Sequence, residues 1–307
     1  MRPLEEAILR TVLYADVFSF PMKADEIHHY LIADEPFSLA EIEQTLLTST
    51  SLKRHLERHD QYIFYKGRHH LIEIRVAHEK ASEVLWKQAI TWGKLLARLP
   101  FVQMVGLTGA LAVRNAADGD DDLDFLLVTR ANRVWIARAF AILLVRMARL
   151  VGITLCPNYV LAETSLYQNR QDIFTAHEVA QMIPLHGQDI YRRFREENDW
   201  VYDYLPNALD PFFDEVEQKL GLGAKIAKGF LEFGLGGRLG NMMERWEYRR
   251  KLQRFSKDLQ TPFSSARLDH TQVKGHFNDH GHPVLRDYHA RLRNCGLESQ
   301  PMALTGD

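Results

Sequence analysis

Asp122 and Asp124 are the two residues of this 307-residue chain whose types and spacing most clearly indicate chemistry. They open the apolar run 123–129, and alternate residues of an extended strand place their side chains on one face. Two carboxylates on one face lie close enough to repel each other, so they need a positively charged partner. A divalent cation suits them, because Mg²⁺ binds carboxylate oxygens and often shares them with substrate phosphates. We therefore expect Asp122 and Asp124 to bind Mg²⁺ or Mn²⁺.

A glycine turn lies shortly before the two aspartates. Thr108, Gly109 and Ala110 follow the apolar run that ends at Leu107 and precede a short predicted helix. Backbone N–H groups at a turn and at the start of a helix are suited to binding phosphate. Arg114 and Asn115 follow on the predicted helix, where they could reach the same phosphate. These residues are predicted to bind a nucleotide.

The order of these two elements resembles the signature of the nucleotidyltransferase superfamily with the DNA polymerase β-like palm fold. The matching segments are Leu107-Thr108-Gly109-Ala110 and, about a dozen residues later, Asp122-Leu123-Asp124-Phe125. The resemblance covers roughly residues 80–185. It implies a Mg²⁺-dependent transfer of NMP from an NTP to a hydroxyl of an unidentified acceptor, with Asp122 and Asp124 as catalytic metal ligands.

Two positions depart from the pattern of this family. Ala110 stands where the family usually has serine, and Asn158 stands mid-strand where catalytic members carry a third carboxylate. Asn158 or the later acid Glu163 is the candidate for completing the metal site. These departures leave a second function open, namely a non-catalytic nucleotide-sensing or DNA/partner-binding protein with a degenerate site. A purely structural interaction module is a third hypothesis.

The remaining acids before the strand have a simpler interpretation. Asp118, Asp120 and Asp121 lie in a segment rich in Asp and Gly, which favour turns for local backbone reasons. We expect them to form a solvated turn. An EF-hand loop is excluded, because the required glycine and closing glutamate are missing.

Residues 1–77 resemble a winged-helix domain. Helices are expected from Pro3, over 23–32 and after the capping residue Ser38, followed by strands 62–65 and 70–74 around the turn 66–69. Such domains contact DNA or other proteins. A basic edge for this role would comprise Lys53, Arg54, Arg58, Lys66, Arg68, His69 and His70.

The rest of the chain is predicted to form two further units of an α+β protein. In residues 78–200, a connecting helix over 78–99 precedes strands 101–107, 123–129 and 154–162, which form a mixed sheet with helices on one side. Residues 192–211 read as a loop, and residues 201–307 as a C-terminal helical extension. Its glycines 234–240 resemble a dinucleotide fingerprint only superficially, because no strand precedes them, so close helix packing or a hinge is expected.

Charged and histidine-rich segments of the extension are interpreted as ordinary surface. The residues Arg245, Arg249, Arg250, Lys251 and Arg254 cover a helix surface and are predicted to be a solvated face, with phosphate or acceptor binding as the alternative. A zinc site among the histidines of 270–289 is disfavoured, because Gly275, Gly281 and Pro283 indicate irregular backbone there.

Composition favours a cytoplasmic protein without a membrane partner. The net charge of −2 supplies no general attraction to nucleic acid. The N-terminus lacks the basic and apolar regions of a signal peptide. The most apolar run of the whole chain, residues 134–153, is interrupted by Arg138, Arg146 and Arg149, so a membrane span is not expected.

Overall fold

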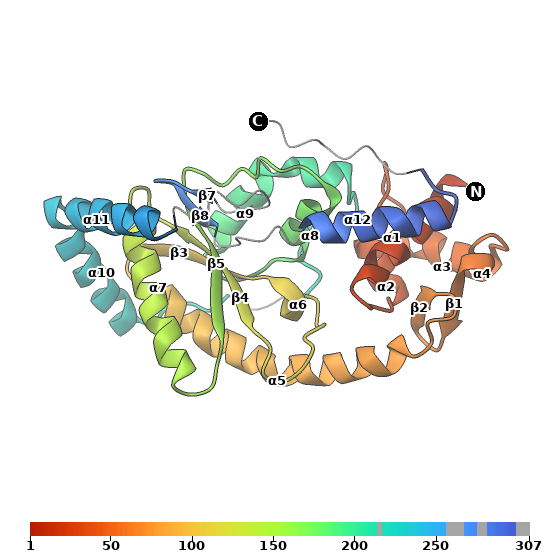
Figure 1. The fold of residues 1–307 in the computed structure, drawn as a ribbon, viewed down its shortest axis with the longest axis horizontal. Helices are drawn as coiled ribbons and strands as arrows, with labels where there is room; N and C mark the ends of the chain where they lie inside the picture. Colours follow the sequence, from red (N-terminus) through yellow and green to blue (C-terminus); the bar gives the residue numbers. More distant parts are fainter. Residues whose placement is uncertain (214–216, 256–266, 275–280, 299–307) are drawn as a thin grey trace.

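The protein has an α+β fold in which helices surround a central sheet (Figure 1). The computed structural model describes residues 1–213, 217–255, 267–274 and 281–298. The six-stranded sheet has the strand order β6–β3–β4–β5–β8–β7. Its strands are β3 (Val102–Leu107), β4 (Leu123–Thr129), β5 (Leu155–Ala162), β6 (Ile183–His186), β7 (Arg267–Leu268) and β8 (Gln272–Lys274).

The sheet is mixed, because β4 and β5 are parallel whereas the other neighbouring strands are antiparallel. The three strands expected from the sequence are present with nearly the expected bounds. The strand β6 was missed, since Pro184 indicated a break after the preceding helix. β6 lies at the edge of the sheet, where a proline that lacks an N–H group is tolerated.

Apolar residues on both faces of β4 give the sheet two cores. Phe125 and Leu127 belong to one core with helices α5 (Leu71–Ala97) and α7 (Val134–Arg149). Leu126 and Val128 belong to the other core, which contains α8 (Ile173–Gln181) and α9 (Gln188–Glu197). The expectation of helices on one side only was therefore wrong, because an apolar central strand must be covered on both faces.

The N-terminal unit consists of helices and one hairpin. Its elements are α1 (Pro3–Val17), α2 (Ala24–His29), α3 (Leu39–Thr48), α4 (Leu52–His55), β1 (Leu56–His59) and β2 (Tyr62–Tyr65). β1 pairs with β2, so the hairpin predicted between strands 62–65 and 70–74 was wrong. Residues 71–74 begin α5 instead, where Leu71 and Arg75 are buried one helical turn apart.

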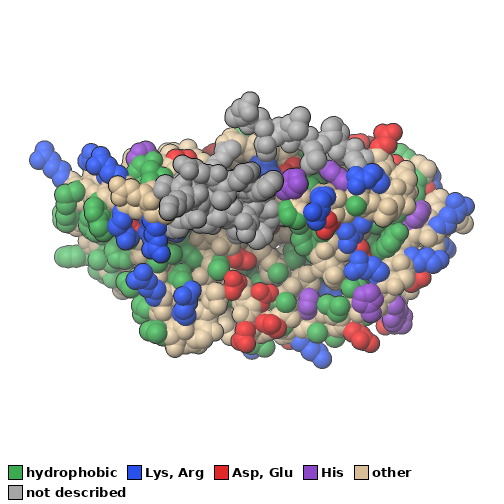
Figure 2. Space-filling view, in the orientation of Figure 1, with side chains coloured by type: hydrophobic (Ala, Val, Ile, Leu, Met, Phe, Trp, Pro, Cys, Tyr) green, Lys and Arg blue, Asp and Glu red, His purple; other side chains and the backbone are tan. Residues whose placement is uncertain are grey.

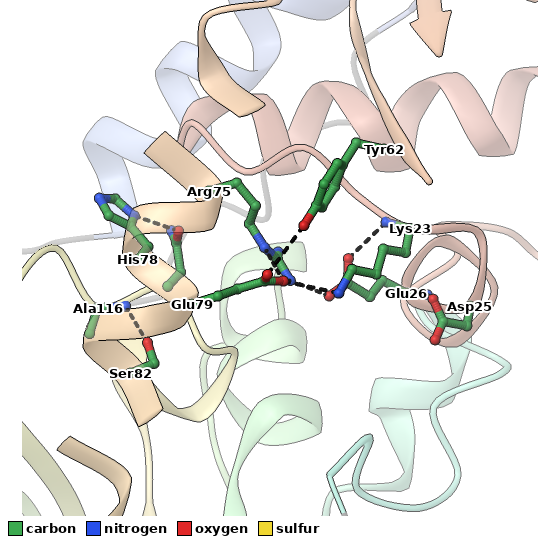
Figure 3. Close-up of polar contacts among 10 residues, drawn as sticks. Lys23, Asp25, Glu26, Tyr62, Arg75, His78, Glu79, Ser82 and Ala116 are labelled. Carbon is green, nitrogen blue, oxygen red and sulfur yellow. Dashed lines mark hydrogen bonds and ion pairs between the residues drawn. The ribbon is translucent and has the colours of Figure 1, made fainter. Parts of the chain in front are cut away.

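A buried ion network joins this N-terminal unit to α5 (Figure 3). Arg75 is 1% exposed and pairs with Glu26 at 2.7 Å and with Glu79 at 2.9 Å. Lys23 donates to Glu79 at 3.0 Å, and the Tyr62 hydroxyl donates to the same carboxylate at 3.2 Å. The network fixes α2 and the hairpin against the first turns of α5.

The C-terminal region continues with helices. After the short 3₁₀ helix η1 (Asp199–Asp203) come α10 (Leu222–Gly236), α11 (Arg238–Phe255) and α12 (Gly281–Asn294). Residues 192–203 are thus largely helical, where a loop was predicted. The glycines mark the break between α10 and α11, and an added Cβ at Gly240 would collide with the Leu235 carbonyl across this break.

The helix α12 returns to the N-terminal unit and packs against α1 and α8 (Figure 1). The Arg291 guanidinium donates to the Asp16 carboxylate at 2.8 Å. Gly281 and Pro283 lie in the first turn of α12, so the irregular backbone predicted there was wrong; Gly275 lies outside the described residues. In the described ranges, no helix combines the length and apolarity needed to cross a bilayer.

Candidate functional site

Asp122 and Asp124 line one cavity of about 480 Å³ together with Thr108 and Gly109. Asp122 lies just before β4 and is exposed, whereas Asp124 is the second residue of the strand and is half-buried. The other cavity wall comes from β5, α8, β8 and the start of α12. Its lining residues include Cys156, Asn158, Arg170, Phe174, Glu178 and Lys274.

The turn after β3 lies directly against Asp124. The Thr108 N–H group donates to the Asp124 carbonyl at 3.0 Å. Gly109 has φ +70°, and a Cβ atom there would overlap the Asp124 carboxylate. The glycine is therefore required both by its left-handed backbone and by close approach. The helix α6 (Gly109–Ala112) that follows has four residues, and Ala110 is exposed at its start.

Two side chains of β5 donate hydrogen bonds to the aspartates. The Asn158 amide donates to Asp124 Oδ1, and Cys156 Sγ donates to Asp122 Oδ2 at 3.3 Å. Burial, and then the hydrogen bond to Asp122, raise the pKa of the Cys156 thiol to about 12, so it stays a neutral donor. The role of Cys156 was not foreseen, although its position two residues before Asn158 gives it the same strand face.

Glu163 does not join this cluster. Its carboxylate accepts a hydrogen bond from the Ala131 N–H group at 3.2 Å, beyond the opposite end of β4. Arg130 follows Asp124 by six residue steps along the strand direction, so this end lies roughly 20 Å from Asp124. Of the two proposed additional ligands, the structure brings Asn158 to the aspartates and leaves Glu163 away from them.

Arg114 and Asn115 face away from the cavity at the aspartates. The Arg114 guanidinium stacks over the Trp86 ring at 3.5 Å, and its backbone has φ +57°. Asn115 shares a 2.9 Å hydrogen bond with His78 and donates to the Phe18 carbonyl. Both side chains therefore connect α6 to other elements in this structure, in contrast to the phosphate contacts expected from their spacing.

Glu178 of α8 is the acid that the sequence did not single out. It is exposed to the same cavity that Asp122 and Asp124 line. Desolvation by neighbouring protein groups raises the pKa of Glu178, and the positive charge of Lys274 opposes the rise. The sequence signal that could have identified Glu178 as a candidate site residue is that it is the one acid in the mostly apolar segment 173–180.

The Asp124 carboxyl group is held close to its neutral form. Burial raises its pKa to about 7; the hydrogen bond from Asn158 lowers it, and the negative charges of Glu178, Asp122 and Asp121 raise it. A nearby positive charge would reverse this effect. Ionisation of Asp124 is therefore unfavourable without a partner, and a bound cation would favour the ionised form.

The donor set of the site fits a hard cation only in part. In the described portion of the chain, no three His, Cys, Asp or Glu side chains form a group placed to hold a metal ion. Asp122 and Asp124 supply carboxylate oxygens, and rotation of the Asn158 amide would present its oxygen. Mg²⁺ commonly takes one or two carboxylates and completes its shell with water and substrate phosphates.

A second cavity of about 330 Å³ adjoins the first and shares Gly109, Phe174 and Glu178 with it. Aromatic side chains dominate its walls, and the Tyr14 and His177 rings stack at 4.0 Å. The contributing elements are α1, the segment before α2, α6, α8 and α12. The aromatic lining comprises Tyr14, Phe18, Phe20, Tyr30, Phe174 and His177.

The histidines of the C-terminal segment do not form a common site among the described residues. His270 packs against Tyr248 with ring centroids 4.1 Å apart, and His289 lies beside Tyr288 on α12. His276 and His280 lie outside the described residues.

No protein family model, curated protein or solved structure matches this chain. A functional interpretation therefore depends on the geometry of the site and on the resemblance of its two short segments. Residues of these two segments, separated by a dozen residues, line one cavity.

Proposed function

We propose that the protein is a Mg²⁺-dependent nucleotidyltransferase with a palm-like domain. The supporting observation is that Asp122 and Asp124 share a cavity with the Gly109 turn, which lies so close to Asp124 that an added Cβ would displace its carboxylate. In this proposal the backbone of Thr108, Gly109 and Ala110 binds the NTP phosphates. Neither Arg114 nor Asn115 is included, because both have other contacts.

Asp122 and Asp124 would hold the cation, with Asn158 beside them. When bound, Mg²⁺ would neutralise charge on the triphosphate and on the departing pyrophosphate. The high pKa of Asp124 supports this assignment, because a carboxylate near other acids gains most from a positive charge. Cys156 would keep Asp122 oriented through its hydrogen bond.

Glu178 would replace the third carboxylate as general base. The acceptor oxygen attacks the α-phosphorus, the bond to the bridging oxygen breaks, and pyrophosphate leaves. The hydroxyl proton passes to Glu178, because a raised pKa makes its carboxylate a stronger base. Because Glu178 also lines the aromatic cavity, we assign that cavity to the acceptor.

A thermal-shift titration with each of the four NTPs, with and without Mg²⁺, tests nucleotide binding. Ligand at a hundred times its Kd should stabilise the protein by about 2.7 kcal/mol. Asp122→Asn/Asp124→Asn should lose the metal-dependent shift. Asp118→Asn/Asp120→Asn, which alters exposed acids of the same turn, should retain it. The absence of a shift with every NTP would reject the nucleotide site and favour an interaction module.

The second candidate is a protein that binds nucleotide without catalysis. The amide of Asn158 occupies the place expected for the third carboxylate, and this observation favours it. The two candidates differ in pyrophosphate release. A Mg²⁺-dependent NTP shift without pyrophosphate release across an acceptor panel would support the binding protein, whereas release that Glu178→Gln abolishes would support the enzyme.

We infer that the N-terminal unit is a winged-helix-like module that contacts protein in preference to DNA. Its third helix, α3, exposes Glu41 and Glu43 together with Leu39 and Leu47. Carboxylates on this helix would repel DNA phosphates. Of the basic edge, Arg68 is already paired with Asp16 at 2.7 Å. Binding to duplex DNA with a steep salt dependence would contradict this inference.

A further inference from the structure

The helix α10 presents its apolar side to solvent. Leu222, Ile226, Phe230 and Phe233 are spaced along one helix face and are 76%, 62%, 80% and 87% exposed. No residue of α10 is buried. A surface helix ordinarily turns such a stripe towards the core, so the orientation of α10 is the reverse of the usual one.

Specific polar contacts on the inward face hold α10 in this orientation. The Lys228 ammonium donates to the Ala97 carbonyl at 2.9 Å and also to the Val102 carbonyl. The Glu232 carboxylate accepts a hydrogen bond from the Phe101 N–H group at 2.7 Å. Rotating the helix so that the apolar stripe faced inwards would break all three hydrogen bonds. The apolar side chains could not replace them as hydrogen-bond partners.

The apolar surface continues onto α11. Leu239, Met242 and Trp246 are 54%, 62% and 62% exposed. This helix is also fixed, because the Glu244 carboxylate accepts hydrogen bonds from the Trp135 and Ile136 N–H groups at 2.9 and 2.8 Å. We call the seven residues Leu222, Ile226, Phe230, Phe233, Leu239, Met242 and Trp246 the apolar patch.

The exposed charges described in α10 and α11 are of one sign. Glu244 and Glu247 are buried, and the Glu232 side chain is 14% exposed. Every exposed charged side chain described in α10 and α11 is therefore a lysine or an arginine. These residues are Lys225, Arg238, Arg245, Arg249, Arg250 and Arg254. Figure 2 shows apolar and basic side chains together at this end of the molecule.

We propose that the apolar patch and its basic rim bind the surface of an anionic phospholipid membrane. Protruding aromatic and aliphatic side chains would enter the headgroup region while the arginines contact lipid phosphates. A second copy of the chain is a poorer occupant. A two-fold contact places the same surface patch of both copies together, and so brings these cationic side chains against one another.

Sedimentation of the full-length protein with sucrose-loaded vesicles tests the proposal. Vesicles of phosphatidylcholine alone are compared with vesicles in which roughly one third of the lipid is phosphatidylglycerol. We expect binding to the anionic vesicles at least about tenfold tighter than to the neutral ones, and weakening in about 0.5 M NaCl. Equal binding to both vesicles, or none, would overturn the proposal.

Two sets of variants separate the apolar and basic contributions. Phe230→Ser/Phe233→Ser and Arg245→Glu/Arg249→Glu should each reduce anionic vesicle binding by about tenfold or more. Val84→Ser/Leu209→Ser changes two apolar residues outside the patch that are 57% and 62% exposed, and should have no effect. Thermal unfolding of each variant confirms that it is folded. If the Phe230→Ser/Phe233→Ser variant instead abolishes a dimer seen by light scattering while vesicle binding is absent, the patch binds a second copy and the proposal is wrong.

Discussion

The side-chain amide of Asn158 donates a hydrogen bond to the carboxylate of Asp124 across two parallel strands. The amide offers Asp124 partial positive charge, which a third carboxylate at position 158 could not do. It thereby lowers the pKa of Asp124 against the larger effect of burial. The same amide supplies no basicity, so Asn158 stabilises the pair of aspartates but cannot accept a proton.

Asn158→Asp should convert the site to one that depends on a cation. Without metal, a third negative charge should lower the melting temperature at pH 8, because like charges would then lie together. With Mg²⁺ or Mn²⁺, affinity should rise by about tenfold. Melting temperatures with increasing metal measure both effects. Asn241→Asp on the exposed surface of α11 is the control, and an unchanged metal response at position 158 would contradict the metal assignment.

The raised pKa of Asp124 predicts how stability changes with pH. Its folded-state pKa of about 7 exceeds the ordinary value of 3.8, so its stabilising contribution is full below pH 3.8 and is lost as the pH rises through 7. Asp124→Asn removes this loss. Between pH 5 and pH 8, the free energy of unfolding of the variant should rise relative to that of the wild type by on the order of 2 kcal/mol. This value is reduced for solvent screening, because Asp124 opens onto a cavity.

Urea unfolding of both proteins at pH 5 and pH 8 measures this difference. Asp118→Asn, in the exposed part of the same turn, should follow the wild type. Parallel unfolding free energies for wild type and Asp124→Asn over this pH range would show that Asp124 is ionised throughout.

Gly109→Ala and Gly67→Ala form a matched pair. Both glycines have positive φ, +70° and +83°, but an added Cβ at Gly67 meets nothing within 4 Å, whereas at Gly109 it meets the Asp124 carboxylate. Gly67→Ala should cost about 1 kcal/mol for its backbone alone. Gly109→Ala should cost clearly more and should also weaken the metal-dependent NTP shift. Denaturant unfolding gives the first quantity; equal losses for the two variants would refute the close approach.

Removing Arg75 should destabilise the protein strongly. Arg75→Met leaves the buried Glu26 carboxylate without its partner, which typically costs about 3–5 kcal/mol. The pKa of Glu26 is already raised by burial, so the unpaired group would protonate more readily. Arg75→Met/Glu26→Gln should recover part of the loss. Lys87→Met, exposed on the same helix, is the control, and urea unfolding measures all three.

The central part of the fold could be predicted because local patterns there agree with tertiary structure. The apolar run of β4 and the alternation of Asp122 and Asp124 indicate a strand whose carboxylates share one face. The glycine at position 109 indicates a tight turn of the backbone after the strand. These signals are local, and the structure brings their residues to one cavity.

The remaining features depend on contacts between distant segments. The position of Glu178 opposite Asp124 follows from the packing of α8 on the sheet, which no spacing reveals. Residues 70–74 form a short run of strand-favouring residues, yet burial of Leu71 and Arg75 against the N-terminal unit favours helix. The exposure of Phe230 and Phe233 also could not be predicted. The helical spacing of apolar residues identifies the apolar face of a helix, but not whether that face lies against the core or in solvent.

The helix α5 runs without interruption for 27 residues, from the hairpin of the N-terminal unit to the underside of the sheet (Figure 1). The boundary expected at residues 77 and 78 therefore falls inside a helix, in the turn that carries Glu79. A fragment cut there would lose part of its own ion network, and neither half would keep a complete wall of the aromatic cavity. The two units thus share a single helix, and the N-terminal unit depends on Glu79, a residue of that helix on the other side of the expected boundary.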